Sequence, residues 1–306
     1  MDCSIIICTY NQAENLKQAL AAVLKQKYAR DKLEVLIIDN RSTDRTRQVV
    51  ESFINNGDYP VRYVYEPKPG LSHARNRGIR EARGEIVIFI DDDALPKNEH
   101  WAANIVNVYS DPQVCAAGGD LEPSWPKGKK PQWLSNFLLP PLGIADFGLS
   151  KVTELHYPVY PWGANISYRK KSVREAGGFL TELGWSSNGT MISGEETELN
   201  LRLEKAGKKI VYVPNAAVLH VISEKKLTES WFMKRAFAQG LSDAAIDIKY
   251  VSKPHLVFTF FRKLANVVAH LGGMVVFSLL RERKSKLFCR YNMRFAAGYV
   301  FRVLRK

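Results

Sequence analysis

The chain has few cysteines and no cysteine motif. Its four cysteines among 306 residues are Cys3, Cys8, Cys115 and Cys289, and no two form a Cys-x-x-Cys pair. This spacing suggests neither a disulfide framework nor a cysteine zinc site, and it fits a reducing cytosol. The start of the sequence also lacks the basic and apolar stretches of a signal peptide, so we expect the body of the protein in the cytoplasm.

Acidic residues are almost absent from the last part of the chain. Residues 249–306 contain 13 basic residues and one acid, Glu282, while the net charge of the whole chain is +13. Residues 1–248 are therefore close to neutral. A nucleic-acid enzyme more often carries basic residues around its cleft, so this pattern argues against a nucleic-acid partner. It predicts a near-neutral body with a basic extension.

The basic extension has one long uncharged stretch, residues 264–280. As a helix it would extend about 26 Å, against a hydrocarbon core of about 30 Å, and Asn266 and His270 weaken a spanning segment. Aromatic residues then recur at helical spacing with arginines on another side. This is typical of an amphipathic helix on an anionic membrane surface. We expect a peripheral protein on the inner face of the plasma membrane; a spanning helix and a packed appendage with solvated charges remain the alternatives.

Short apolar runs alternate with helical patterns over the first 120 residues. The pattern predicts helices between five strands, at residues 3–9, 33–38, 61–65, 86–90 and 114–118. Near-continuous apolar strands joined by helices are typical of a mostly parallel α/β sheet with helices on both faces. In such sheets, ligands bind at the carboxyl ends of the strands.

Acidic side chains follow two of these strands. Asp91, Asp92 and Asp93 come directly after the strand at residues 86–90, where extended geometry sends Asp91 and Asp93 to the same side. Two hard oxygen ligands suit Mg²⁺ or Mn²⁺, which in turn binds a diphosphate. Because three adjacent carboxylates repel one another, we favour a metal site over a solvated turn. Asp39 ends another strand, where it can bind a base or ribose, while its neighbours can cap the next helix.

Several short motifs occur in a fixed order over residues 3–240. They are Cys-Thr-Tyr-Asn at residues 8–11, Asp39, the segment from Gly70 through Ala74-Arg75-Asn76 to Gly78, the aspartates at 91–93, Trp-Gly-Ala-Asn at 162–165, Gly-Gly-Phe at 177–179 and Gly-Glu-Glu-Thr-Glu-Leu at 194–199. In this order they resemble glycosyltransferase family 2. The resemblance implies the GT-A fold, a Rossmann-like and mostly parallel α/β sheet with helices on both faces, followed here by a basic helical extension.

The resemblance also implies roles for individual residues. The catalytic base is an acid of a Gly-Glu-Asp motif, where this chain has Glu195-Glu196. Glu196 takes the Asp position and is the expected base, and Glu195 remains an alternative. Without a catalytic role, these acids would simply form the charged first turn of a helix. The metal would be held by Asp93, with Asp91 and with His220, a residue that is as often purely structural. The expected nucleotide-binding residues are Thr9, Tyr10, Glu14, Asp39, Arg75, Asp91 and Asp92.

The implied function is inverting, metal-dependent transfer of a single sugar. The donor would be a UDP or GDP sugar and the acceptor a glycan or a polyprenyl-linked molecule, as in bacterial surface polysaccharide assembly. Processive synthases usually carry Gln-x-x-Arg-Trp, which is absent here. We expect three parts: a nucleotide-sugar-binding half at 1–120, an acceptor-binding and catalytic half at 121–248, and the membrane-associating extension at 249–306.

Two other functions remain possible on sequence grounds. A sugar-phosphate nucleotidyltransferase shares an acidic metal site, but it would show a glycine-rich loop and a basic motif after the first strand, where this chain has Thr-Tyr-Asn-Gln at residues 9–12. A membrane-bound, non-catalytic glycan-binding protein has no reason to keep the complete acidic set. A nicotinamide-dependent dehydrogenase lacks support, because no Gly-x-Gly-x-x-Gly follows the first strand.

Overall fold

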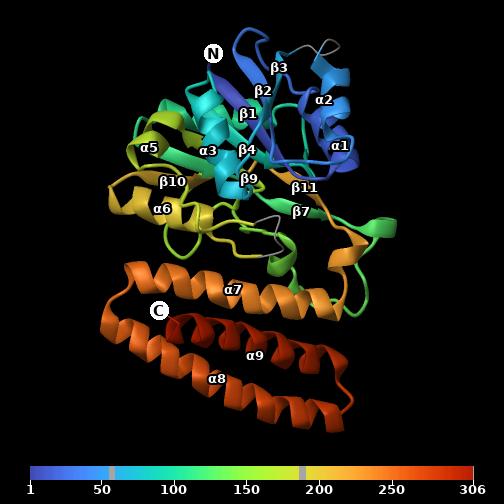
Figure 1. Ribbon diagram of the computed structural model, residues 1–306, viewed down its shortest axis with the longest axis vertical. Helices are drawn as coiled ribbons and strands as arrows, with labels where there is room; N and C mark the ends of the chain where they lie inside the picture. The colour runs from blue at the N-terminus through green and yellow to red at the C-terminus, as the bar shows by residue number, and fades with distance from the viewer. Residues whose placement is uncertain (55–58, 186–190, 306) are drawn as a thin grey trace. The chain divides into compact units, whose positions relative to one another are not determined.

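The computed structural model describes residues 1–54, 59–185 and 191–305 (Figure 1). The chain divides into two compact units. The first, which we call the sheet unit, comprises Met1–Ser124, Gly143–Glu182 and Glu195–Val221; the second, the helical unit, comprises Trp125–Leu142, Leu183–Gly194 and Ile222–Lys306. The expected division at residues 120 and 248 stays a prediction.

The sheet unit contains an eight-stranded sheet in the order β3-β2-β1-β4-β9-β6-β10-β8. The five predicted strands are confirmed and pair as a mostly parallel sheet. They are β1 (Cys3–Thr9), β2 (Leu33–Asp39), β3 (Val61–Tyr65), β4 (Ile86–Asp91) and β6 (Val114–Gly118). Strand β9 (Asn165–Arg169) runs antiparallel between β4 and β6, and β10 (Lys209–Tyr212) and β8 (Thr153–Leu155) complete the sheet.

Helices cover both faces of this sheet. Right-handed crossovers put α1 (Ala13–Val23) and α2 (Thr46–Ile54) on one face, because β1, β2 and β3 step in one direction. The step from β3 back to β4 reverses that direction and puts α3 (Leu71–Glu81) on the other face. The remaining helices of the unit are α4 (Trp101–Asn107), a 3₁₀ turn at Val108–Ser110, α5 (Lys170–Glu175) and α6 (Glu195–Lys205).

The apolar runs that predicted the strands form the core. Ile5, Ile6 and Ile7 of β1 are fully buried, as are Val35 and Leu36 of β2. Strands that are apolar on both faces need cover on both, which the two helical layers supply. The reversal of strand order falls between β1 and β4, and such a switch point is where open α/β sheets bind ligands.

The sequence predicted only part of a second, three-stranded sheet. Its order is β5-β11-β7, with β5 (Ala94–Pro96), β11 (Val218–Val221) and β7 (Leu121–Ser124). Two residues separate β4 from β5, which lies outside the eight-stranded sheet and pairs antiparallel with β11. This pairing brings the end of β4 next to a strand more than a hundred residues further along the chain.

The helical unit is built on three long helices, α7 (Glu229–Tyr250), α8 (Lys253–Leu279) and α9 (Arg283–Leu304). Helix α9 lies between α7 and α8 (Figure 1). A Cβ on Gly240 would lie 2.0 Å from the Phe295 carbonyl oxygen, and one on Gly298 would lie 2.1 Å from that of Phe237. The backbones of α7 and α9 therefore touch where these glycines face each other. Short 3₁₀ turns precede α7, at Pro126–Gly128, Asn136–Leu138, Pro140–Leu142 and Glu224–Lys226.

Helix α8 presents an apolar surface. Within the described residues, it is the one helix long and apolar enough to cross a membrane by length and composition; its 18-residue window has a mean hydropathy of 1.2 and none of that window is buried. The helix is longer than the predicted segment 264–280 because it begins at Lys253. Large exposed side chains recur along it, including Phe258, Phe261, Val268 and Val275.

Candidate functional site

Three strand ends of the sheet unit lie side by side. Thr9 pairs with Asp39 across β1 and β2, and Cys8 pairs with Asp91 across β1 and β4. The Thr9 hydroxyl donates a hydrogen bond to Asp92 Oδ2 at 2.6 Å. The predicted gathering of polar groups at this edge of the sheet is therefore present.

A cavity of about 450 Å³ opens beside Asp39. Asp39 is 2% exposed, and its carboxylate accepts hydrogen bonds from the Ser42 backbone N–H at 2.8 Å and the Tyr63 hydroxyl at 2.7 Å. These two donors fix the carboxylate in one orientation. The cavity is lined by Asp39, Ser42, Asp44, Arg47, Tyr63 and Tyr65.

Asp93 and His220, both predicted as metal ligands, lie side by side in the structure; their role as ligands stays a prediction. The register of β5 with β11 sets His220 opposite Ala94, and the Val221 N–H donates to the Asp93 carbonyl at 2.7 Å. His220 Nε2 then lies 3.1 Å from Asp93 Oδ1. Short strand pairing, rather than neighbouring sequence, creates this pair.

The second nitrogen of His220 is held by the backbone. Nδ1 lies 3.1 Å from the Gly143 carbonyl oxygen, and Gly143 has a φ of +77°. A carbonyl only accepts, so Nδ1 carries the proton and Nε2 is the nitrogen that faces Asp93. An imidazole whose other nitrogen donates to a carbonyl is a common arrangement of metal-ligating histidines.

The donor chemistry of this pair fits a divalent cation, although the full predicted set is not assembled. A carboxylate oxygen and an imidazole nitrogen suit Mn²⁺. Among the residues that the structure describes, no three His, Cys, Asp or Glu side chains form a group able to hold a metal. Asp91, the third expected ligand, instead lies beside Arg75, with 3.7 Å between its Oδ1 and the guanidinium NH2.

Arg75 is buried at the centre of the acidic residues. Its side chain is 2% exposed, and its NH1 donates to Glu195 Oε1 at 2.6 Å. The guanidinium also lies 5.8 Å and 5.5 Å from the ring centroids of Phe89 and Phe179. A Cβ on Gly163 would lie 2.3 Å from Arg75 NH2, so the glycine of the Trp-Gly-Ala-Asn motif leaves room for the arginine.

The two adjacent glutamates have different surroundings. Glu195 is 2% exposed and bound to Arg75, and burial together with the neighbouring Glu196 carboxylate raises the pKa of Glu195 to about 7, although Arg75 lowers it. Glu196 is half-buried, and its Oε1 lies 3.4 Å from the Gly163 N–H that donates to it. Oε2 of each glutamate is buried and has no hydrogen-bond partner within the described part of the chain. The two acids therefore differ in exposure and in how Oε1 is held, and Glu196 is the less firmly held.

Two predicted nucleotide-binding residues lie at the surface. Tyr10 is 41% exposed at the end of β1. Glu14 forms an exposed ion pair with Arg45, whose NH2 lies 3.1 Å from Glu14 Oε1. Their roles stay predictions, as does that of Arg75 toward the nucleotide.

One motif residue has a structural role that sequence reasoning missed. Asn165 is fully buried, accepts from Trp101 Nε1 at 3.0 Å and donates to the Ala216 carbonyl at 2.7 Å. It therefore ties β9 to α4 and to the chain before β11. The contact of the Gly143 carbonyl with His220 was missed as well. The only sequence signal for the positive φ of Gly143 was its place in a loop rich in turn residues.

Comparison with known proteins identifies the family. The model of glycosyl transferase family 2 matches residues 4–175, more than half of the chain. The chain belongs to this family. Its fold is the GT-A fold and it is a glycosyltransferase, which disfavours both the nucleotidyltransferase and the non-catalytic glycan-binding protein.

Relatives and solved structures extend this comparison. The chain is 27% identical over 254 residues to the glucosyl-dolichyl phosphate glucuronosyltransferase of Haloferax volcanii, which covers 82% of this chain and 79% of the relative. The mannosyltransferase PcManGT of Pyrobaculum calidifontis, solved with GDP-Man and Mn²⁺, has a TM-score of 0.69 at 21% identity over 99% of this chain and 87% of its own. Staphylococcus aureus TarS 1–349, solved with UDP-GlcNAc, has a TM-score of 0.55 at 15% identity over 96% and 92%.

The raised pKa of Glu195 predicts a pH-dependent contribution to stability. An acid whose pKa rises from 4.5 to about 7 on folding destabilises the folded state as the pH climbs between these values, by roughly 3 kcal/mol in total. Below pH 4.5 and above pH 7 its contribution is constant. Glu195→Gln should therefore gain stability relative to the wild type across this window. Urea unfolding at a series of pH values measures the free energy of unfolding of both proteins. If the two values change in parallel from pH 4.5 to 7, the pKa of Glu195 is not raised.

Proposed function

We propose that the protein is an inverting glycosyltransferase that moves one sugar from a UDP or GDP sugar to a lipid-linked acceptor. The observation that carries this proposal is the contrast between the two glutamates at the start of α6. Glu195 is buried and its Oε1 is held by Arg75, while Glu196 is half-buried and its Oε1 has only a long contact with the Gly163 N–H; Oε2 of each glutamate has no partner among the described residues. A general base must be able to reach the proton that it removes, and Glu196 is the less tightly held of the two acids.

The donor side of the reaction belongs to the strand ends. The cavity of about 450 Å³ beside Asp39 would hold the nucleoside, and the Asp39 carboxylate would accept a hydrogen bond from the base or a ribose hydroxyl. Thr9, Tyr10, Glu14, Asp91 and Asp92 complete the proposed nucleotide-binding set. Support comes from the PcManGT and TarS structures, which contain GDP-Man and UDP-GlcNAc.

A divalent cation, Mn²⁺ or Mg²⁺, would be held by Asp93 and His220. When bound, it supplies positive charge that stabilises the departing nucleoside diphosphate without a proton transfer. Asp91 would join these ligands after releasing Arg75. The Gly143 carbonyl orients the imidazole so that Nε2 faces the cation site. The Mn²⁺ in the PcManGT structure agrees with this choice.

The acceptor side of the reaction belongs to Glu196. Its carboxylate takes the proton of the acceptor hydroxyl as that oxygen attacks the anomeric carbon, and the bond to the nucleoside diphosphate breaks on the opposite face. The new glycosidic bond therefore has inverted configuration. General base catalysis of this kind contributes about 10²- to 10⁴-fold to the rate. Arg75 meanwhile neutralises Glu195 and lies near Asp91, so it limits repulsion among the acids.

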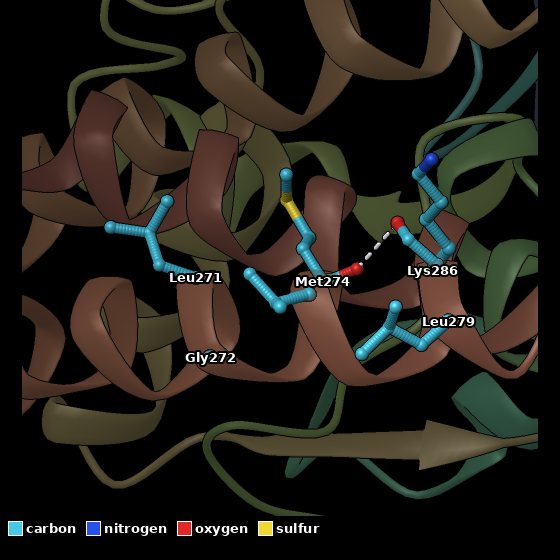
Figure 2. A pocket seen from close by; sticks show the side chains of 7 residues that line it. Leu271, Gly272, Met274, Leu279 and Lys286 are labelled. Carbon is cyan, nitrogen blue, oxygen red and sulfur yellow. Dashed lines mark hydrogen bonds between the residues drawn. The ribbon is translucent and has the colours of Figure 1, made fainter.

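The acceptor would be a polyprenyl-linked glycan at an anionic membrane surface. The Haloferax relative is named for a dolichyl phosphate substrate. The apolar face of α8 would lie in the membrane interface, and a groove of about 590 Å³ runs along it beside Lys286 of α9 (Figure 2). A lysine beside an apolar groove suits an anionic lipid surface. The protein would then be peripheral on the cytoplasmic face of the plasma membrane and serve surface polysaccharide assembly.

Glu196→Gln should abolish transfer while nucleotide binding persists. The amide has nearly the same shape but does not accept a proton, so kcat should fall by about 10²- to 10⁴-fold. Nucleoside diphosphate release from UDP-glucose, UDP-GlcNAc, UDP-glucuronate and GDP-mannose with membrane extracts as acceptor measures the reaction, and calorimetric titration with UDP and GDP measures binding. Glu154→Gln, at an exposed glutamate of β8, is the control, and Glu195→Gln tests the alternative base. A dead Glu195→Gln with an active Glu196→Gln would show that Glu195 is the base.

Asp93→Asn and His220→Asn should each weaken metal-dependent nucleotide binding. Loss of either ligand should lower UDP or GDP affinity in the presence of Mn²⁺ by more than about tenfold, with no change when EDTA is present. Thermal shift with nucleotide and Mn²⁺ gives this comparison, and Asp111→Asn, at a partly exposed aspartate paired with Lys209, serves as the control. Unchanged Mn²⁺ dependence in both variants would exclude the pair as the metal site.

The double variant Val268→Glu/Val275→Glu should lose membrane binding. These valines are 67% and 63% exposed on α8, so the changes should not disturb folding. Each valine contributes about 1.5 kcal/mol when buried in lipid, and affinity should fall by at least about tenfold. Flotation with phosphatidylcholine vesicles, with and without phosphatidylglycerol, measures binding. The matched control is Val152→Glu/Val159→Glu, at valines 50% and 51% exposed on the sheet unit; equal flotation of both double variants contradicts the proposal.

A further inference from the structure

Three residues of α7 converge on one serine of the loop that leads into α6. Arg235 NH2 donates to Ser193 Oγ at 3.1 Å, and Ser193 Oγ donates to Gln239 Oε1 at 3.3 Å. The Ser193 backbone N–H donates to Ser242 Oγ at 2.9 Å. Because these α7 residues are four and three positions apart, they share one face of the helix, and all of these contacts lie within the helical unit.

The hydrogen bonds have a consistent direction. Ser242 is fully buried and its hydroxyl proton goes to the Ala238 carbonyl at 2.9 Å, so its oxygen accepts from Ser193. Gln239 accepts from Ser193 through Oε1 and donates through Nε2 to Asp243 at 2.7 Å. Ser193 is thus fixed through both its backbone and its side chain.

The next residue is also confined. Gly194 has a φ of +94°, a conformation that side chains with a Cβ rarely adopt, and a Cβ there would lie 3.1 Å from Ile246 Cδ1 of α7. Helix α6 begins at the following residue, Glu195. The chain that enters the first turn of α6 is therefore held by α7 at the two positions before it.

We propose that Arg235, Gln239 and Ser242 are positioning residues for the catalytic base, acting through Ser193. This inference rests on the proposed role of Glu196, which follows Ser193 by three residues. A general base must reach hydrogen-bond distance of the proton that it removes, and displacement by about 1 Å costs about 10²-fold in rate. Loss of the Ser193 contacts would let the start of α6 shift without unfolding the helix.

Ser193→Ala and Gln239→Ala test this role by kinetics. We expect kcat to fall about 10- to 100-fold while KM for the nucleotide sugar stays within about twofold, because the donor site uses other residues. Ser193→Thr, which keeps the hydroxyl, should restore most of kcat. Ser223→Ala, at a half-buried serine of the helical unit whose hydroxyl accepts from the Lys225 N–H, should leave both constants unchanged. Nucleoside diphosphate release from the same UDP and GDP sugars measures them; a raised KM with normal kcat overturns the proposal.

A double variant separates positioning from a general loss of stability. If Ser193 acts through Glu196, Ser193→Ala/Glu196→Gln should be no slower than Glu196→Gln alone. Additive losses overturn the inference, and an active Glu196→Gln overturns the proposed function instead. Amide hydrogen exchange over α6 provides a readout without substrate: Ser193→Ala should raise exchange there at unchanged Tm, and exchange equal to that of Ser223→Ala also contradicts the inference.

Discussion

The buried guanidinium of Arg75 is the interaction on which the site depends. An isolated charge in a protein interior is costly unless it is paired, and Arg75 is paired with Glu195 and lies 3.7 Å from Asp91. These two acids come from α6 and from the end of β4, far apart in the chain. One cation therefore joins the strand end proposed for the donor to the helix start proposed for the acceptor.

The rings of Phe89 and Phe179 and the missing side chain of Gly163 make this arrangement possible. Aromatic faces attract a guanidinium, and the glycine removes the Cβ that would collide with it. Two family motifs, Trp-Gly-Ala-Asn and Gly-Gly-Phe, thus shape the surroundings of Arg75 through Gly163 and Phe179.

The parts that sequence reasoning predicted are those with local physical causes. The strands of the large sheet are continuous apolar runs, and their carboxyl ends fall together because parallel strands share one direction. The pairing of Asp93 with His220 depends on β5, which has only three residues and no periodicity to detect. Helix α7 was not predicted because buried polar residues such as Ser242 interrupt its apolar pattern. The partner of Glu195 is 120 positions away, which no local pattern reveals.

The Gly-Glu-Glu sequence at the start of α6 explains how two adjacent acids take different roles. Successive helical positions point about 100° apart, so one glutamate turns to the buried Arg75 while the next turns toward Gly163. The extra methylene of a glutamate at position 196 lengthens the reach of its carboxylate and adds rotational freedom. The contact with the Gly163 N–H, at 3.4 Å, is long for a hydrogen bond and holds this carboxylate weakly. A base with a longer and weakly held side chain needs a well-fixed backbone, which makes the anchoring of the residues before α6 more important here than it would be for an aspartate.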